Sequence, residues 1–326
     1  MQFSSVTNGM SRYNSPVSAG DLPFNPASRS RFSGFADLYD TNRPSPPARL
    51  GPLLAGYATT TRPAVVDLGS GTGLSSRWAA DWAQSVVAIE PNDEMRAVAQ
   101  ARPAHRIEYR AGLGKNTGLS PSSADVVLAV QAMHWMEPEP TLAEVARILR
   151  PGGVFAVVDA DWPPVAGVVG AERAWAVLHS RIRVLEARLA AGEEGAHLRR
   201  PITSDDPALA QDDLADPHRD RVMPGGLRSW SKSGHLERMR ASGHFAFTRE
   251  IALSDAVGGG VERFVALMYS QGDYQGLLKA GLSPDDIGAG RFEKEARAGF
   301  GEAERLPDLS FSWRIRIGTT PITATG

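Results

Sequence analysis

Short strand-like runs alternate with segments of helical spacing through the first half of the chain. Each run is bounded by turn residues and is shorter than a typical helix. The runs occupy residues 64–68, 86–89, 107–110, 124–130 and 154–159. Helix-compatible segments lie between or before them, at 50–57, 74–83 and 142–149. This alternation predicts an α/β fold, and the run 124–130, apolar on both faces, is typical of a central parallel strand.

The alternation stops after the fifth run and resumes near residue 244. Between them, apolar residues recur at helical spacing and predict one long amphipathic helix. They are Trp175, Leu178, Ile182, Leu185 and Leu189. Residues 193–226 are polar and read as a loop. After a short helix at 233–242, we expect strands at 245–253 and 309–317, with helices at 261–270 and 284–300 between them.

Three glycines follow the first strand with the spacing G-x-G-x-G, at Gly69, Gly71 and Gly73. A strand that enters a glycine turn and then a helix leaves backbone N–H groups open to a ligand, because no Cβ stands in the way. The second strand ends in Glu90, where a carboxylate is placed to accept hydrogen bonds from two ribose hydroxyls. The pattern predicts the nucleotide-binding corner of a doubly wound sheet.

The runs VVDLGSGTG and VVAIEPNDEM closely resemble class I S-adenosyl-methionine-dependent methyltransferases. The finer likeness is to the group acting on small molecules, which includes trans-aconitate- and menaquinone-type methyltransferases. It covers residues 32–159 and, more loosely, 244–320. The resemblance implies a Rossmann-like doubly wound seven-stranded sheet in the order 3-2-1-4-5-7-6, with strand 7 antiparallel. It also implies S-adenosyl-methionine as cofactor.

The domain organisation follows from these segments. Residues 1–29, rich in Ser, Asn, Pro and Gly, are expected to be a disordered tail. Residues 30–161 and 244–320 are expected to form the methyltransferase core. Residues 162–243 are expected to form a mainly helical lid over the substrate region, inserted between strands 5 and 6.

The resemblance also assigns cofactor contacts. A Phe…Tyr…Arg-Pro segment lies over the methionine end in the family, which here points to Tyr39 and Arg43. The turn after the third strand flanks the adenine, but its fourth position, often an acid, is Gly114 in this chain. Backbone groups of Gly112 and Leu113 are the substitute, with Met95 packing on the ring or simply in the core. The remaining expected contacts are Asp67, Gly69, Ser70, Gly71, Gly73, Glu90, Pro91, Gln131, His134 and Trp135.

Methyl transfer needs a base only if the acceptor carries a proton at attack. His134 and Asp161 follow strands 4 and 5 and are the two candidates. Because a His-Trp pair commonly shapes the cofactor pocket in this family, we favour that role for His134 and regard Asp161 as the better base. An aromatic or apolar substrate pocket is expected from Trp162, Tyr269, Gln271 and Tyr274.

These features predict a methyltransferase acting on an O-, N- or C-nucleophile of a small organic acceptor, with secondary metabolism as the expected setting. A non-methylating binder of the same cofactor, such as a regulator or a cyclase, remains an alternative. A nicotinamide oxidoreductase is disfavoured, because the third glycine arrives one position early and Leu74 follows it.

The composition and net charge of the chain limit the classes of partner that we expect. The net charge of −2 shows no basic excess, so binding to nucleic acid or an anionic membrane is not expected. The chain has no cysteine, no apolar run of bilayer length and no secretory signal pattern, and we expect a cytoplasmic protein. The stretch 212–216 matches D-D-x-x-D, but we interpret it as a solvated loop and expect no metal. The oligomeric state is left open.

Overall fold

A seven-stranded sheet forms the centre of the computed structural model, which describes residues 34–322 apart from 103, 203–219, 223–227 and 302–307. Its strands, from one edge to the other, are β3 (Ile107–Arg110), β2 (Ser85–Ile89), β1 (Ala64–Leu68), β4 (Ala124–Val130), β5 (Leu149–Ala160), β9 (Leu309–Thr319) and β8 (Phe247–Val257). The last strand, β9, is antiparallel to both of its neighbours. The predicted sheet and strand order are therefore confirmed.

Both faces of the sheet are buried, as the apolar runs predict. Successive residues of a strand point to opposite faces, so Val65 and Val66 belong to different core clusters. On one face, α3 (Leu50–Tyr57) and α4 (Leu74–Ala80) pack with Leu54 and Trp78 in the core. On the other face lie α6 (Pro138–Ile148) and α10 (His235–Ala241).

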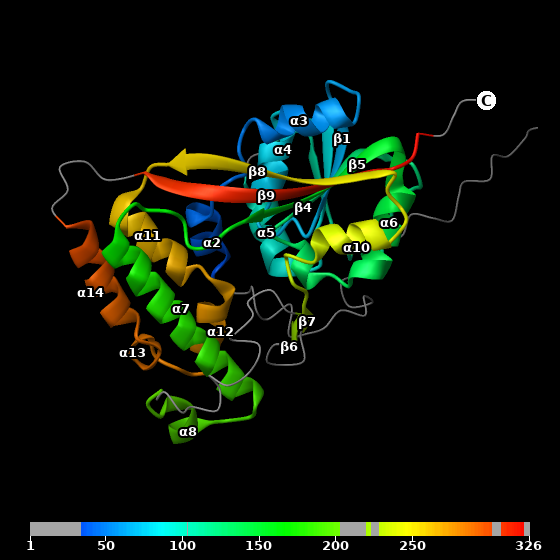
Figure 1. The fold of residues 1–326 in the computed structure, drawn as a ribbon. Helices are drawn as coiled ribbons and strands as arrows, with labels where there is room; N and C mark the ends of the chain where they lie inside the picture. The colour runs from blue at the N-terminus through cyan, green and yellow to red at the C-terminus, as the bar shows by residue number, and fades with distance from the viewer. Residues whose placement is uncertain (1–33, 103, 203–219, 223–227, 302–307, 323–326) are drawn as a thin grey trace, which may run out of the picture.

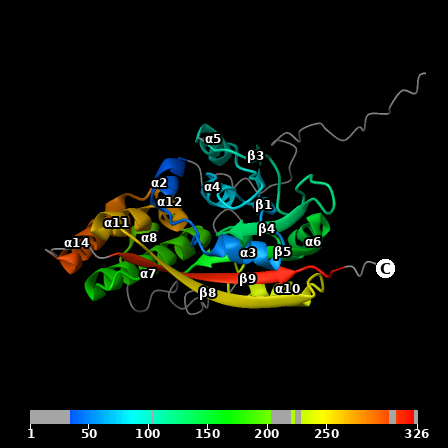
Figure 2. The same cartoon turned by 90° about the horizontal axis from the view of Figure 1, so that it is seen from above.

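A group of helices stands beside the sheet. It contains α7 (Val169–Ala190), α11 (Gly260–Tyr269), α12 (Gly272–Lys279), α13 (Pro284–Ile287) and α14 (Ala289–Phe300). In Figures 1 and 2 the long strands β8 and β9 run from the sheet to this group. The group draws on two segments of the chain, because α7 precedes β8 whereas α11 to α14 follow it. The sequence had predicted a mainly helical lid at 162–243 and assigned the helices at 261–270 and 284–300 to the core.

Local signals in the sequence account for several boundaries. The side chain of Asn92 caps α5 (Asp93–Ala101) by accepting from the N–H groups of Glu94 and Met95. Before the first strand, α2 (Ala36–Asn42) carries Tyr39. Helix α12 was not expected, because Gly272 and Gly276 disfavour a helix. Burial of its apolar face, which carries Tyr274 and Leu277, stabilises this helix.

Short elements complete the described residues. They are a 3₁₀ turn η2 (Met133–Trp135), α8 (Gly195–Arg199) and the paired strands β6 (Arg221–Val222) and β7 (Arg228–Ser229). The expected tail at 1–29 and the acidic stretch 212–216 lie outside the described residues. Within the described ranges, no helix has the length and apolar character needed to cross a bilayer.

Candidate active site

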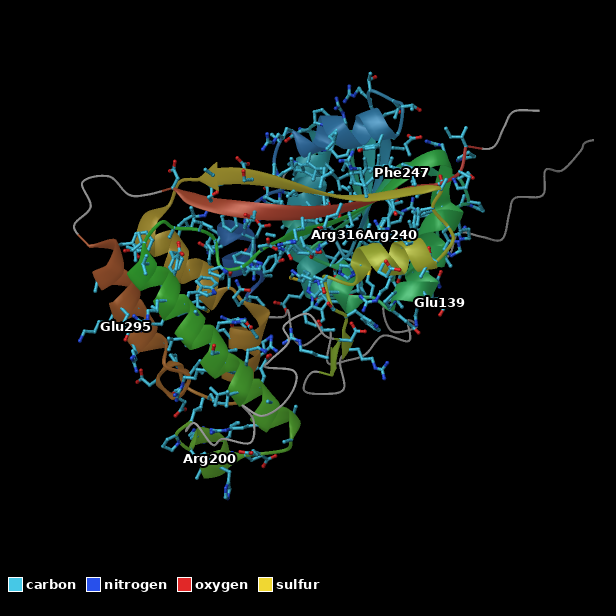
Figure 3. All side chains as sticks on the ribbon, in the orientation of Figure 1. Glu139, Arg200, Arg240, Phe247, Glu295 and Arg316 are labelled. Carbon is cyan, nitrogen blue, oxygen red and sulfur yellow. The ribbon has the colours of Figure 1, made fainter. Side chains whose placement is uncertain are left out.

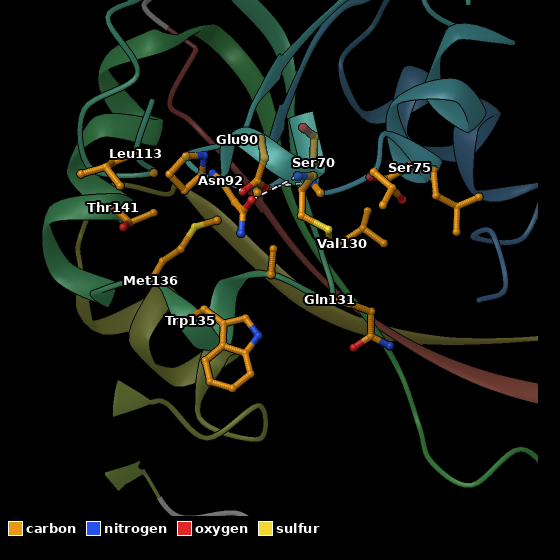
Figure 4. Close-up of a pocket in the computed structure, with 18 of the residues that line it drawn as sticks. Ser70, Ser75, Glu90, Asn92, Leu113, Val130, Gln131, Trp135, Met136 and Thr141 are labelled. Atoms are coloured by element: carbon orange, nitrogen blue, oxygen red, sulfur yellow. Dashed lines mark hydrogen bonds between the residues drawn. The ribbon is translucent and has the colours of Figure 1, made fainter. Parts of the chain in front are cut away.

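A cavity of about 420 Å³ opens where the central strands end, and we name it the first cavity (Figure 4). Its walls come from the turn after β1, the ends of β2 and β4, and the turns after β3 and β4. Ligands of doubly wound sheets bind at this edge. Twelve of the residues expected to contact a cofactor line it: Tyr39, Arg43, Gly69, Ser70, Gly71, Glu90, Pro91, Met95, Gly112, Leu113, Gln131 and Trp135.

The glycine turn has a backbone that side chains would disrupt. Gly69, Gly71 and Gly73 have φ values of +67°, +55° and +79°. A Cβ at Gly69 would lie 2.8 Å from the Cβ of Ala132, and one at Gly73 would lie 2.5 Å from the Tyr109 hydroxyl. Gly73 thus shapes the turn from outside the cavity lining.

Asp67 lies beneath this turn and does not line the first cavity, contrary to expectation. Its Oδ2 accepts hydrogen bonds from the hydroxyls of Ser75 (2.7 Å) and Ser76 (2.6 Å) at the start of α4. Burial raises the pKa of Asp67, while these two hydrogen bonds oppose the shift. Asp67 therefore fixes the strand–helix junction on which the glycine turn rests.

Glu90 is held at the cavity wall by backbone donors. The N–H groups of Gly71 and Asn92 each donate to its carboxylate at 2.8 Å. Figure 4 shows Glu90 beside Asn92 and Ser70. Because only 8% of Glu90 is exposed, desolvation raises its pKa to about 7. The site thus offers a fixed oxygen acceptor that titrates near neutral pH.

The far end of the first cavity is closed by apolar groups around Gly114. A Cβ at Gly114 would come within 2.6 Å of Met136 Sδ and 3.2 Å of Thr141 Cγ2. These two side chains fill the place where the resembled family often carries an acid. The N–H of Leu113 donates to Asn116 O (3.1 Å), so this turn is internally bonded.

Arg43 lies between two aromatic rings, with its guanidinium carbon 4.8 Å from the Tyr39 ring centre and 4.5 Å from that of Trp162. It donates to Ser270 O and Gln271 Oε1, both at 3.1 Å. Burial lowers its pKa. Its Nε is buried and has no hydrogen-bond partner among the described residues, which leaves a donor for an anionic ligand group.

A second cavity of about 530 Å³ adjoins the first. Both cavities are lined by Tyr39, Arg43, Gln131, Trp135, Trp162 and Trp230. His134 and Asp161 line the second cavity. His134 does not itself line the first cavity, but its ring centre lies 4.7 Å from that of Trp135, which does, so the cofactor-pocket role that we favoured for it stays a prediction.

Two of the four expected substrate residues, Trp162 and Gln271, line the second cavity. Tyr269 and Tyr274 do not. Their rings stack at 5.2 Å within the helical group, and burial raises the pKa of both. They are therefore part of the packing of α11 and α12.

The lining includes residues from the insertion that no local motif indicated. The backbone N–H of Trp230 donates to the carbonyl oxygen of His134 at 2.8 Å. Lys232 donates from Nζ to Gln131 Oε1 at 2.5 Å. Gln131 itself has φ +52°, a costly conformation for a residue with a side chain, and such outliers concentrate at functional sites.

Comparison with known proteins agrees with this geometry. The family described as "Methyltransferase domain" matches residues 66–157. Over 128 residues the chain is 36% identical to an uncharacterized methyltransferase of Mycobacterium tuberculosis, covering 39% of this chain and 51% of that protein. Over 124 residues it is 30% identical to a Saccharomyces cerevisiae protein designated an S-adenosylmethionine-dependent methyltransferase, covering 36% and 43%. The chain thus spans about half the length of the curated relatives it matches.

The fold is shared with solved structures. A candidate type II methyltransferase from Anaeromyxobacter dehalogenans superposes with a TM-score of 0.52 at 21% identity, covering 86% of this chain and 99% of that one. The glycine turn and Glu90 lie within the matched segment, at the edge where doubly wound sheets bind ligands. Residues 66–157, at the centre of the sheet, therefore match a methyltransferase domain, and one relative of this segment is designated S-adenosylmethionine-dependent.

Proposed function

We propose that the protein transfers a methyl group from S-adenosyl-methionine to a small organic acceptor. The observation that carries this proposal is the pair of adjoining cavities, one built on the glycine turn and Glu90, the other open to polar side chains. A methyl donor in the first cavity and an acceptor in the second would meet at their shared wall.

The residues of the first cavity fit the donor group by group. Glu90 offers a carboxylate to the two ribose hydroxyls, and Arg43 offers Nε and its charge to the methionine carboxylate. Met95, 5% exposed and beside Gly71, offers an apolar surface near the base. When bound, the donor supplies an activated methyl on sulfur, and the protein supplies alignment and exclusion of water.

The acceptor class is part of the proposal, as is the narrower assignment to the trans-aconitate- and menaquinone-type group. The second cavity combines the rings of Trp135, Trp162 and Trp230 with charged side chains. This lining suits a small molecule with an aromatic or apolar body and polar substituents. The role of residues 162–243 as a lid also remains a prediction.

Calorimetry tests cofactor choice. We expect S-adenosyl-methionine and S-adenosylhomocysteine to bind in the micromolar range, about −8 kcal/mol, and NAD and NADP to bind far more weakly. Equal or tighter NAD binding contradicts the proposal.

Turnover to S-adenosylhomocysteine in a screen of small hydroxyl, amine and carbon acids then separates an enzyme from a cofactor binder. Tight cofactor binding without turnover on any acceptor favours the non-methylating alternative.

A further inference from the structure

His134 lines the second cavity, and Asp159 lies buried behind it because β4 and β5 are parallel neighbours. Asp159 is the last residue but one of β5, and His134 lies in η2, which follows β4. The register pairs Val130 with Val158, so the residues just beyond these positions emerge side by side. The distance from His134 Nδ1 to Asp159 Oδ1 is 4.0 Å.

The two oxygens of Asp159 face different partners. Oδ2 accepts from Nη1 of Arg316 at 2.9 Å, and Arg316 also binds Glu250 at 2.6 Å. Oδ1 faces His134 Nδ1 and lies 3.3 Å from Lys232 Nζ. Asp159 is 2% exposed, and Figure 3 shows Arg316 near the middle of the molecule, whereas Glu295 and Arg200 lie at its periphery. The carboxylate is thus fixed from behind by Arg316, and its other oxygen lies between Lys232 and the imidazole.

A carboxylate beside one imidazole nitrogen selects the tautomer. It favours the proton on Nδ1 and leaves the lone pair on Nε2 as a base. A separation of 4.0 Å is longer than a hydrogen bond, but such contacts are often long in sites without substrate and shorten when substrate binds. The backbone of His134 is held by the hydrogen bond from the backbone N–H of Trp230 to its carbonyl, at 2.8 Å, and its ring centre lies 4.7 Å from that of Trp135.

Asp161, the other candidate base, already forms an ion pair. Both oxygens of Asp161 accept from Nε of Arg314 at 3.1 Å. Charged groups from several elements line the same cavity and bear on any titration there: Arg43, Asp161, Glu186, Arg221, Lys232, Asp273, Arg314 and Arg316.

We propose that His134 is the general base of the methyl transfer and that Asp159 is its positioning residue. The acceptor is then a small molecule whose methylated atom carries a proton, a hydroxyl or an amine. This inference rests on the proposed function and adds its acceptor chemistry.

The methyl transfer forms one bond to carbon and breaks another. The lone pair of the acceptor oxygen or nitrogen forms the bond to the methyl carbon, and the pair of the breaking C–S bond goes to sulfur, which becomes a neutral thioether. The proton of the acceptor moves to His134 Nε2, and the resulting imidazolium is stabilised by Asp159 and later releases its proton to water.

The first test needs no substrate. Nitrogen-15 NMR of the full chain, with His134→Gln to assign the signal, should show His134 in the Nδ1–H tautomer. Asp159→Asn should shift it toward Nε2–H, whereas Asp161→Asn, the matched loss of a cavity carboxylate, should not. S-adenosylhomocysteine binding checks that each variant is folded.

A wild-type His134 in the Nε2–H form contradicts the proposal, as does an equal shift in the Asp161 variant. If Asp159→Asn does not fold, the tautomer of His134 in the wild-type protein still tests the proposal.

The second test uses an acceptor from the turnover screen. His134→Gln should lower kcat by a hundredfold or more, with cofactor affinity unchanged, and should remove the acidic limb of the pH–kcat profile. Asp159→Asn should shift the pH of that acidic limb and should lower kcat less than His134→Gln does. A tenfold loss or less in kcat, or an acceptor atom without a proton, overturns the proposal. A wild-type protein that binds no S-adenosyl-methionine would instead sink the proposed function.

Discussion

Glu90 shows how one residue combines an expected role with a property that only burial provides. Its place after the second strand predicts that it accepts hydrogen bonds from the ribose hydroxyls. Its enclosure raises its pKa to about 7, so at pH 6 most Glu90 carboxyls are protonated and at pH 8 most are ionised.

Cofactor affinity should therefore depend on pH through Glu90. Ribose hydroxyls donate to the ionised carboxylate, so binding of S-adenosylhomocysteine should strengthen about tenfold between pH 6 and pH 8. Glu90→Gln should bind ten- to a hundredfold more weakly at pH 8 and lose this dependence, since a hydrogen bond to a charged group contributes about 1.5–3 kcal/mol. Calorimetry across this pH range measures the affinity of the wild type and of Glu90→Gln, with Glu108→Gln on β3 as the control. A flat wild-type profile would show that Glu90 is not the acceptor.

Gly69 illustrates a requirement for the absence of a side chain. Gly69→Ala forces φ +67° on a residue with a Cβ and brings that Cβ within 2.8 Å of Ala132. We expect a loss of about 1–3 kcal/mol in unfolding free energy and at least tenfold weaker cofactor binding. Gly56→Ala, exposed on α3 with open space at its Cβ, should be neutral or stabilising by about 0.5–1 kcal/mol. Urea unfolding of both variants measures this contrast; equal effects refute it.

At the scale of elements, α7 links the insertion to the helices that follow β8. Trp175, 2% exposed, contacts Phe264, Phe292 and Trp162 at ring-centre distances of 5.1, 6.2 and 6.2 Å. Through Trp162 this aromatic cluster reaches the wall shared by the two cavities.

Trp175→Ala should therefore cost about 3–5 kcal/mol in unfolding free energy. Val177→Ala, on the same helix and 50% exposed, should stay within about 0.5 kcal/mol. Denaturant unfolding compares the two. A small effect of Trp175→Ala would mean that the helical group contributes little to the stability of the molecule.

For the whole molecule, the raised pKa of Glu90 makes stability fall as pH rises. The unfolded carboxyl ionises near 4.5, whereas the folded one ionises near 7, so between these values the folded state retains a proton that the unfolded state has released. Raising pH through this window favours unfolding.

The wild-type protein should accordingly lose about 2–3 kcal/mol of stability relative to Glu90→Gln between pH 5 and pH 8. Urea unfolding of both proteins at the two pH values measures this difference. No change, or a change of opposite sign, would contradict a buried carboxyl at this position.

The sequence by itself determined the sheet and the nucleotide corner of this protein. Apolar strands, the glycine spacing and the acid at Glu90 are local signals, because each depends on a few adjacent residues and on backbone geometry. The strand order, by contrast, was implied by the resemblance to the methyltransferase family, and the structure confirms it.

Only the tertiary structure decided which distant side chains share a wall. Asp67 and Tyr274 have the right chemistry for a site but are packed away from it, whereas Lys232 and Trp230 reach it from an insertion without a motif. The partner of His134 depends on strand register, and the occupation of Asp161 depends on Arg314 arriving from the end of the chain. Side-chain neighbours far apart in sequence are set by packing of the whole chain, which no local pattern encodes.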